Sequence, residues 1–135
     1  EGLYDAVPGA HVHAQDGFEM AYSMFPPTPR RGLLLIDPSY EVKDDYVAMP
    51  NHLSKIAKIW PVGVLMLWYP ILSDARHRTM KSAILHSLPD ALNHEVYFEP
   101  AREGHRMVGS GLVVVNAPWG LDGELAKLAD HFAKL

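Results

Sequence analysis

The fold class of this chain is decided by one stretch, Gly32-Leu33-Leu34-Leu35-Ile36-Asp37-Pro38-Ser39-Tyr40. An apolar run between a glycine and an Asp-Pro turn is typical of a buried strand. Short apolar runs bounded by turn residues also occur at residues 10–15, 62–69 and 111–116. A further segment, residues 94–99, mixes polar and apolar positions as expected of an edge strand. The runs at 32–37 and 62–69 lack alternation, which indicates parallel strands covered by helices.

Helical patterns lie between these predicted strands. One spans residues 46–60, where Pro50 must sit in a first turn or kink the helix. A second begins with Ser73 or Asp74 as its cap, and a third, capped by Asp122, carries the clearest amphipathic stripe. Alternating strands and helices predict an α/β domain with a mostly parallel sheet.

The composition is that of an ordinary globular domain. The chain has 135 residues, of which 48% are hydrophobic and 21% charged, and it has no cysteine. Disordered, collagen-like and coiled-coil chains are excluded, as are a disulfide scaffold, a zinc finger and a cysteine nucleophile. The longest uncharged stretch, residues 59–73, contains two prolines and is too short to span a membrane. Without a recognisable secretory signal, we expect a cytoplasmic protein with no membrane partner.

Charge and histidine content restrict the possible partners. Twelve Lys and Arg against 16 Asp and Glu give a net charge of -4, so a nucleic acid would have to meet local basic patches. Three small clusters qualify, either as phosphate contacts or as ordinary solvated surface: Arg30 with Arg31; Arg76, His77 and Arg78 with Lys81; and Arg102 with His105 and Arg106. The eight histidines, His11 and His13 included, lack a recognisable ligand spacing, and we expect no metal site.

Ligands of open α/β sheets bind beyond the carboxyl ends of the strands. Four places qualify on that rule: residues 16–18, 37–41, 68–70 and 116–119. Each alone is explained as a good turn, but four such ends point to one functional rim. At the sharpest of them, Asp37 can accept a hydrogen bond from an amino group, a carbonyl in the Pro38 turn can accept a second, and Tyr40 can stack on the ring. These contacts suit a planar base that carries an exocyclic amine.

The same trio resembles the Asp-Pro-Pro-Tyr motif of amino-methyltransferases, with Ser39 in place of the second proline. Together with residues 14–18, 29–41, 67–70 and 109–119, it is similar to the RlmJ family, which methylates N6 of an adenine in 23S ribosomal RNA. The resemblance implies a class I S-adenosylmethionine-dependent methyltransferase, with a Rossmann-like, mostly parallel sheet and an antiparallel C-terminal strand. Its substrate would be protein-free or early-assembly 23S ribosomal RNA, without an obligatory protein partner.

The resemblance also assigns roles to particular residues. Asp37 matches the catalytic proton acceptor, whereas Pro38 and Tyr40 belong to the substrate side. Asp16 and Gly17 match the acidic and glycine pair that meets the adenine end of S-adenosylmethionine. Other aromatic residues near the expected rim either help to bind a ligand or pack in the core, and they are Phe18, Tyr69, Trp68 and Trp119.

One part of a class I methyltransferase has no counterpart in the chain. The Gly-rich loop after the first strand and the acidic residue after the second are both absent upstream of Asp16. Residues 1–135 are therefore expected to be the C-terminal part of a single methyltransferase domain, and the isolated piece to bind S-adenosylmethionine weakly and to be inactive. Two alternatives stay open: a P-loop-type nucleotide hydrolase with Asp37 on magnesium, and a non-catalytic RNA-binding module of methyltransferase fold.

Overall fold

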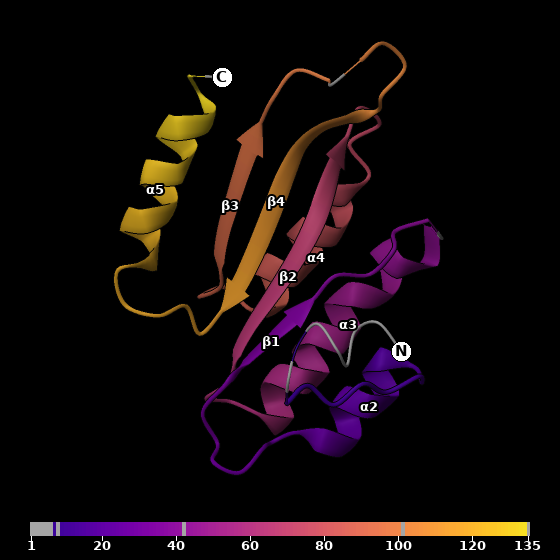
Figure 1. The fold of residues 1–135 in the computed structure, drawn as a ribbon, viewed down its shortest axis with the longest axis vertical. Helices are drawn as coiled ribbons and strands as arrows, with labels where there is room; N and C mark the ends of the chain where they lie inside the picture. The colour runs from indigo at the N-terminus through magenta and orange to yellow at the C-terminus, as the bar shows by residue number, and fades with distance from the viewer. Residues whose placement is uncertain (1–6, 8, 42, 101, 135) are drawn as a thin grey trace.

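The computed structural model describes residues 7, 9–41, 43–100 and 102–134 of the chain. Four strands form one sheet in the order β1-β2-β4-β3, and helices connect or flank them (Figure 1). The elements are α2 (Gly17–Met24), β1 (Leu33–Ile36), α3 (Lys43–Ile59), β2 (Val64–Leu72), α4 (His77–Ser87), β3 (Leu92–Tyr97), β4 (Met107–Val115) and α5 (Leu121–Phe132).

The strand directions confirm the expected class of sheet. β1 pairs with β2 in parallel, and β4 pairs with both β2 and β3 in antiparallel register. Three strands therefore point the same way, and the last strand of the chain is inserted between two of them in the opposite direction (Figure 1). The mixed residues near 94–99 do form the edge strand, β3, although it begins two residues earlier than predicted.

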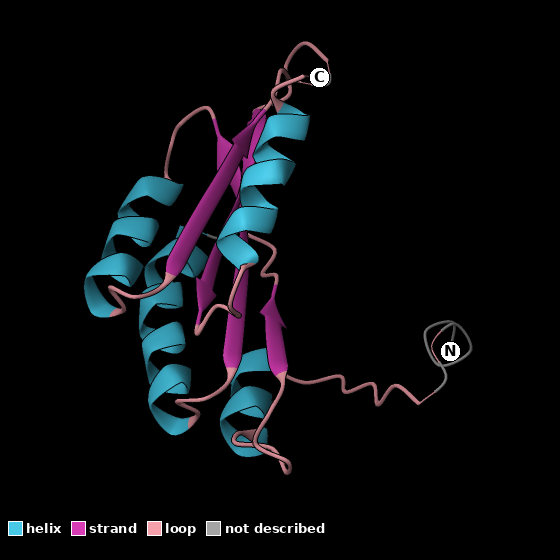
Figure 2. Ribbon diagram, turned by 90° about the vertical axis from the view of Figure 1, so that its left-hand side faces the viewer, coloured by secondary structure: helices cyan, strands magenta, loops and turns pink. Residues whose placement is uncertain are grey.

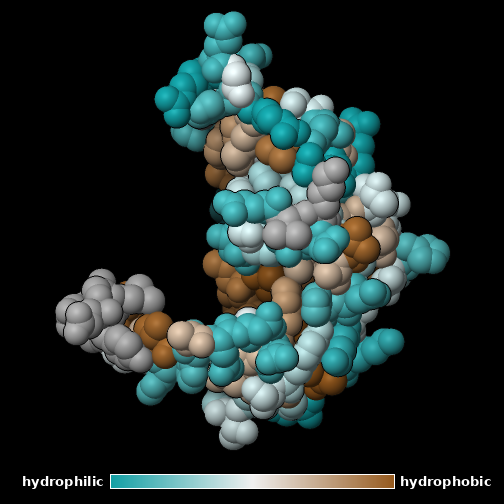
Figure 3. All heavy atoms as spheres, turned by 90° about the vertical axis from the view of Figure 1, so that its right-hand side faces the viewer, coloured by the Kyte–Doolittle hydropathy of each residue, from teal (hydrophilic) through white to brown (hydrophobic). Residues whose placement is uncertain are grey.

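The core lies between the sheet and the helices α3 and α4, which occupy one side of it (Figure 2). β2 alternates along its length, and Leu65, Leu67 and Tyr69 are completely buried. α5 lies along β3 at the far edge. At the other edge, Leu33 and Leu35 of β1 are more than half exposed, and Figure 3 shows apolar side chains in a hollow of the surface. One face of β1 thus stays open.

The strand predicted at residues 10–15 is absent. This segment has no regular secondary structure, and residues 11–15 are exposed. A strand needs a neighbour to satisfy its backbone N–H and C=O groups, and no described strand lies beside this segment. The prediction of a strand there is therefore wrong for this chain.

Two helix caps also differ from their predictions. α4 begins after Arg76 rather than at Ser73 or Asp74, because the Asp74 carboxylate is taken up by the guanidinium groups of Arg76 and Arg106. α5 begins after Gly120, which adopts a left-handed conformation with φ of 83°, and Asp122 lies in the first turn instead. In α3, the helix extends on both sides of Pro50.

A polar network lies between β2, β3 and α4. Glu95 accepts hydrogen bonds from Lys81 Nζ at 2.6 Å, Tyr69 OH at 2.8 Å and Tyr97 OH at 2.9 Å. Asn93 in turn donates to the Tyr69 hydroxyl at 2.7 Å. Burial by itself raises the pKa of Glu95, but the three donors outweigh it and hold that pKa below its usual value. The charged carboxylate is thus the form that the fold requires.

We expect Glu95→Gln to lower the free energy of unfolding by about 1–2 kcal/mol at pH 7, since charge-assisted hydrogen bonds are weakened. The lowered pKa of Glu95 means that its stabilisation is complete above the unfolded pKa, about 4.3, and is lost as the pH falls through the folded value. The variant should therefore lose less stability than wild type on acidification, as measured by urea unfolding at pH 7 and pH 3.5. Glu124→Gln is the control, because its pair with Lys127 is exposed.

Candidate active site

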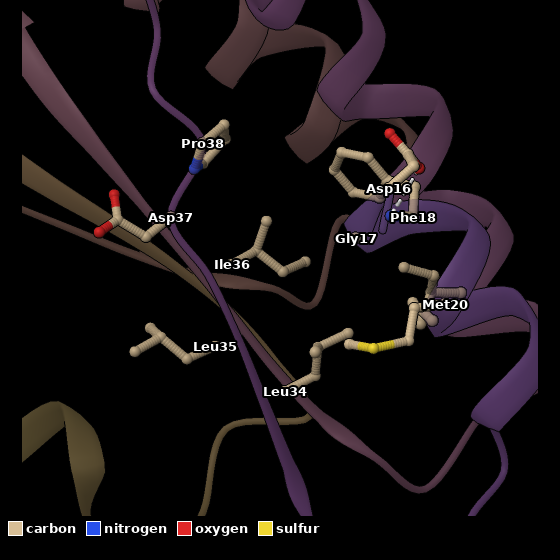
Figure 4. A pocket seen from close by; sticks show the side chains of 11 residues that line it. Asp16, Gly17, Phe18, Met20, Leu34, Leu35, Ile36, Asp37 and Pro38 are labelled. Atoms are coloured by element: carbon tan, nitrogen blue, oxygen red, sulfur yellow. Dashed lines mark hydrogen bonds between the residues drawn. The ribbon is translucent and has the colours of Figure 1, made fainter. Parts of the chain in front are cut away.

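The carboxyl end of β1 brings Asp37 to the rim of the sheet. Side chains alternate along the strand, so Leu34 and Ile36 point toward α2, whereas Leu35 and Asp37 point to the other side (Figure 4). The strand ends at Ile36 and Pro38 follows the aspartate, which leaves the Asp37 side chain exposed. A rigid strand thus carries this carboxylate to its position.

The start of α2 supplies a second polar group. Asp16 caps the helix, and its Oδ1 accepts from the amides of Phe18 at 3.0 Å and Glu19 at 2.9 Å. Among the described residues, neither Asp16 Oδ2 nor the Gly17 amide has a hydrogen-bond partner. A Cβ at Gly17 would meet no atom within 4 Å, so the space beside this amide is open. This helix is not among the predicted elements, although an aspartate three residues before Glu19 is the pattern of a capping box.

A cavity of about 310 Å³ lies between the start of α2 and the end of β1, and the Asp37 carboxylate points away from α2 at its edge (Figure 4). Asp16 and Gly17 lie on one side of it, and Asp37 and Pro38 lie on the other (Figure 4). The remaining walls are apolar, and they are formed by Phe18, Met20, Ala21, Leu34, Leu35, Ile36 and Ile56. An adjacent acceptor and donor at the mouth of an apolar cavity match the edge of an adenine ring, so the residues present fit the adenine end of S-adenosylmethionine.

Tyr40 occupies a different place from these four residues. Its side chain is only 5% exposed, and its hydroxyl donates to the carbonyl of Trp68 at 2.7 Å. Its backbone is in the left-handed region, with φ of 55°, and its amide donates to Asp45 at 3.1 Å. Burial raises the pKa of the Tyr40 phenol, which stays protonated. Tyr40 therefore fixes the turn after Asp37 from within the core.

A second, smaller cavity lies next to Asp37. It has a volume of about 270 Å³, and its lining consists of Leu35, Asp37, Trp68 and Leu112. The Trp68 side chain is partly buried, and its indole Nε1 donates to Ser110 Oγ at 2.7 Å. Asp37 belongs to both cavities.

The other two predicted rim positions differ from the prediction. Residues 68–70 are inside β2, which continues to Leu72; Trp68 lines the cavity beside Asp37, whereas Tyr69 is completely buried in the core. Residues 116–119 follow β4, whose direction is reversed, so they lie at the opposite end of the sheet from Asp37 (Figure 1). There Asn116 donates to the carbonyls of Pro61 and Gly63, and Trp119 is fully exposed.

Two of the three basic clusters meet at Asp74, and the third lies apart from them. Arg30 and Arg31 precede β1 and therefore lie at the end of the strand remote from Asp37. Arg76 and Arg106 share Asp74 beyond the carboxyl end of β2, and Arg102 donates to His105 at 2.6 Å. Within the described part of the chain, no three His, Asp or Glu side chains are grouped to hold a metal ion, and no helix is long and apolar enough to cross a membrane.

The sheet and its reversed last strand define a Rossmann-like methyltransferase fold. Comparison with known families makes the class specific: residues 5–135 match the family described as "Ribosomal RNA large subunit methyltransferase D, RlmJ". The chain belongs to this RlmJ family.

Individual relatives agree with the family match. The chain is 32% identical to ribosomal RNA large subunit methyltransferase J of Haemophilus influenzae over 124 residues, which are 91% of the chain and 44% of that protein. The Escherichia coli protein of the same name is 34% identical over 117 residues, 86% of the chain and 42% of that protein. A crystal structure of a Legionella pneumophila protein superimposes with a TM-score of 0.78 at 26% identity, covering 87% of this chain and 43% of that one. The chain thus spans less than half the length of these relatives.

Proposed function

We propose that the protein containing this chain transfers a methyl group from S-adenosylmethionine to the exocyclic N6 of an adenine in 23S ribosomal RNA. The observation that carries the proposal is the single cavity that joins Asp16 and Gly17 to Asp37 and Pro38. Family membership supports ribosomal RNA as the substrate and a methyl donor as the cofactor.

Each residue has a stated task in this proposal. Asp16 Oδ2 accepts from the amino group of the cofactor's adenine, and the Gly17 amide donates to a ring nitrogen. When bound, the cofactor supplies an activated methyl group. Asp37 accepts a hydrogen bond from the N6 amine and thereby orients the lone pair of that amine. Asp37 also takes up the proton that the amine releases, directly or through water. Pro38 fixes the turn whose carbonyl accepts the second amine hydrogen. Tyr40, which is buried, holds this turn from within the core through its hydroxyl and its amide.

We further propose that residues 1–135 are the C-terminal part of a single methyltransferase domain. β1 is an edge strand among the described residues, and its exposed Leu33 and Leu35 are the apolar surface that a further part of the domain would cover. The chain's share of its relatives' length, 42–44%, supports this division. Without that further part, we expect the chain to bind S-adenosylmethionine weakly and to be inactive.

The alternatives have less support. A P-loop hydrolase needs a Gly-x-x-x-x-Gly-Lys-Ser/Thr loop, which the chain does not contain, and its relatives are methyltransferases by name. A non-catalytic module would not require Asp37 and Pro38 to share a cavity with Asp16. The proposed substrate is protein-free or early-assembly 23S ribosomal RNA with no obligatory protein partner, and it implies a cytoplasmic protein.

The test is methylation of protein-free 23S ribosomal RNA by the full-length protein, followed by mass spectrometry of the nucleosides. We expect N6-methyladenosine as the product, and a methyl group on any other atom would contradict the proposal.

Asp16→Ser keeps an N-cap oxygen but removes the carboxylate, so calorimetry should find S-adenosylmethionine affinity lowered by about tenfold or more. Asp130→Ser, on the exposed surface of α5, should leave that affinity unchanged.

A further inference from the structure

We propose that Arg76 and Arg106, the two arginines that share Asp74, bind a phosphate of the RNA backbone next to the target nucleotide. This inference rests on the proposed function and adds a contact that holds the RNA strand rather than the reacting base. The pair joins two loops beyond the carboxyl end of β2, since Arg76 directly precedes α4 and Arg106 directly precedes β4.

The two guanidinium groups are held in place by one carboxylate. Asp74 Oδ2 accepts from Nε of Arg76 at 2.8 Å and from an Nη group of each arginine. The amide of Ser73 donates to the Arg106 carbonyl at 2.9 Å, which ties the two loops together. Hydrogen bonds from Arg76 hold the pKa of Asp74 at about 2, so the carboxylate stays charged and keeps both arginines oriented.

The pair keeps both charge and hydrogen-bond donors for an anion. Two guanidinium groups carry more positive charge than one carboxylate neutralises. Among the described residues, the Nη1 group of Arg76 and the Nε and Nη1 groups of Arg106 have no hydrogen-bond partner. The side chain of Arg106 is 57% exposed and that of Arg76 is 29% exposed. Arginine donors in a fixed planar arrangement match the oxygens of a phosphate.

A buried tyrosine next to the pair adds a further donor. The Arg76 guanidinium carbon lies 5.8 Å from the centre of the Tyr46 ring. Tyr46 is buried, and its hydroxyl has no hydrogen-bond partner among the described residues, although buried hydroxyls are nearly always paired. Because Tyr46 belongs to α3, the pair lies on the side of the sheet that the helices cover, away from the open face of β1.

The same tyrosine relates the pair to Asp37. The ring of Tyr46 packs on that of Tyr40, with centroids at 4.8 Å, and Tyr40 follows Asp37 by three positions in the chain. β1 and β2 are parallel, so Asp37 and the arginine pair lie beyond the same ends of their strands (Figure 1). A base that leaves its stack stays joined to the phosphates on either side of it. An adenine at Asp37 therefore brings its flanking phosphates to this rim, where the arginines fix the strand.

The test is binding of protein-free 23S ribosomal RNA by the full-length protein at several salt concentrations, with Arg106→Gln, Arg106→Lys and Arg31→Gln. Loss of one phosphate contact in Arg106→Gln should reduce the slope of log affinity against log salt by about 0.7–0.9 and lower the affinity about threefold to tenfold. Arg106→Lys should keep the slope, because the charge remains. Arg31→Gln removes an exposed arginine before β1, at the opposite end of the sheet, and should change neither value.

Steady-state methylation separates this contact from the chemistry. In Arg106→Gln, we expect KM for RNA to rise about threefold to tenfold, whereas kcat and S-adenosylmethionine affinity stay within about twofold of wild type. The double variant Arg76→Gln/Arg106→Gln should reduce the salt slope by about 1.4–1.8. Urea unfolding is measured alongside, because a loss of stability alone does not change how many phosphates the folded protein contacts.

The inference is overturned if Arg106→Gln and the double variant have the salt slope and RNA affinity of Arg31→Gln. It is also overturned if Arg106→Lys loses as much of the slope as Arg106→Gln, since the contact would then not depend on charge. RNA that binds with the expected slopes but acquires no N6-methyladenosine would instead overturn the proposed function.

Discussion

Asp37→Asn should lower kcat for RNA methylation by about a hundredfold or more and leave S-adenosylmethionine affinity nearly unchanged. The amide keeps the shape of the side chain, but it replaces one acceptor oxygen with a donor that repels the amine hydrogens. The substitution also removes the carboxylate that takes up the proton in the proposed function. Because Asp37 lies across the larger cavity from Asp16 and Gly17, we expect the cofactor contacts proposed for those two residues to persist.

The measurement is single-turnover methylation of 23S ribosomal RNA at saturating cofactor, together with calorimetry of S-adenosylmethionine binding. Asp130→Asn, an exposed aspartate on α5, is the matched control and should retain full activity. A variant at Asp37 that binds the cofactor normally and methylates at the wild-type rate would refute the catalytic assignment. A variant that loses cofactor affinity as well would place Asp37 on the cofactor side of the site.

The second large effect concerns stability. Trp60→Ala should lower the free energy of unfolding by about 3–5 kcal/mol, the usual consequence of removing a buried tryptophan. Trp60 is completely buried at the end of α3, its ring stacks on Phe25 with centroids at 4.5 Å, and its Nε1 donates to the Arg30 carbonyl at 2.9 Å. A Cβ at Gly63 would lie only 2.1 Å from this ring. Trp60 thus joins the segments that lead into β1 and β2.

Urea unfolding of the full-length protein, followed by circular dichroism, measures this effect. Trp119→Ala is the control, because its fully exposed side chain contributes within about 0.5 kcal/mol. Gly63→Ala tests the same packing from the other side, since its methyl group would have to displace the Trp60 ring. If Trp60→Ala and Gly63→Ala both had the urea midpoint of the wild-type protein, the structural role of Trp60 would be contradicted.

The candidate site was partly accessible from the sequence. Asp37 and Pro38 follow an apolar strand, and a strand end is a position that the sequence pattern defines well. The sequence also points to Asp16 and Gly17 as site residues, but it does so through a predicted strand at residues 10–15, where the structure has an exposed segment and then the helix α2. The shared cavity is a finding of the structure alone, because the 19 residues from 18 to 36 separate its two polar sides in the chain.

The smaller cavity illustrates what local patterns miss. Trp68 and Leu112 are 44 positions apart in the chain, and only the antiparallel pairing of β2 with β4 makes them neighbours. Because β4 runs antiparallel to β2, Trp119 likewise lies at the end of the sheet opposite to Asp37. The direction of a strand in the sheet depends on which strands pair with one another, and no single segment of the sequence encodes that pairing.

The sequence by itself determined the α/β class, the RlmJ resemblance and the carboxylate at the end of β1, because apolar runs, turn residues and short motifs are local properties. Only the tertiary structure decided that Tyr40 is buried while Trp68 faces a cavity, and that Asp37 lies between two cavities. Burial and cavity walls are set by residues that are distant in the chain, and their positions follow from how the strands pair and the helices pack.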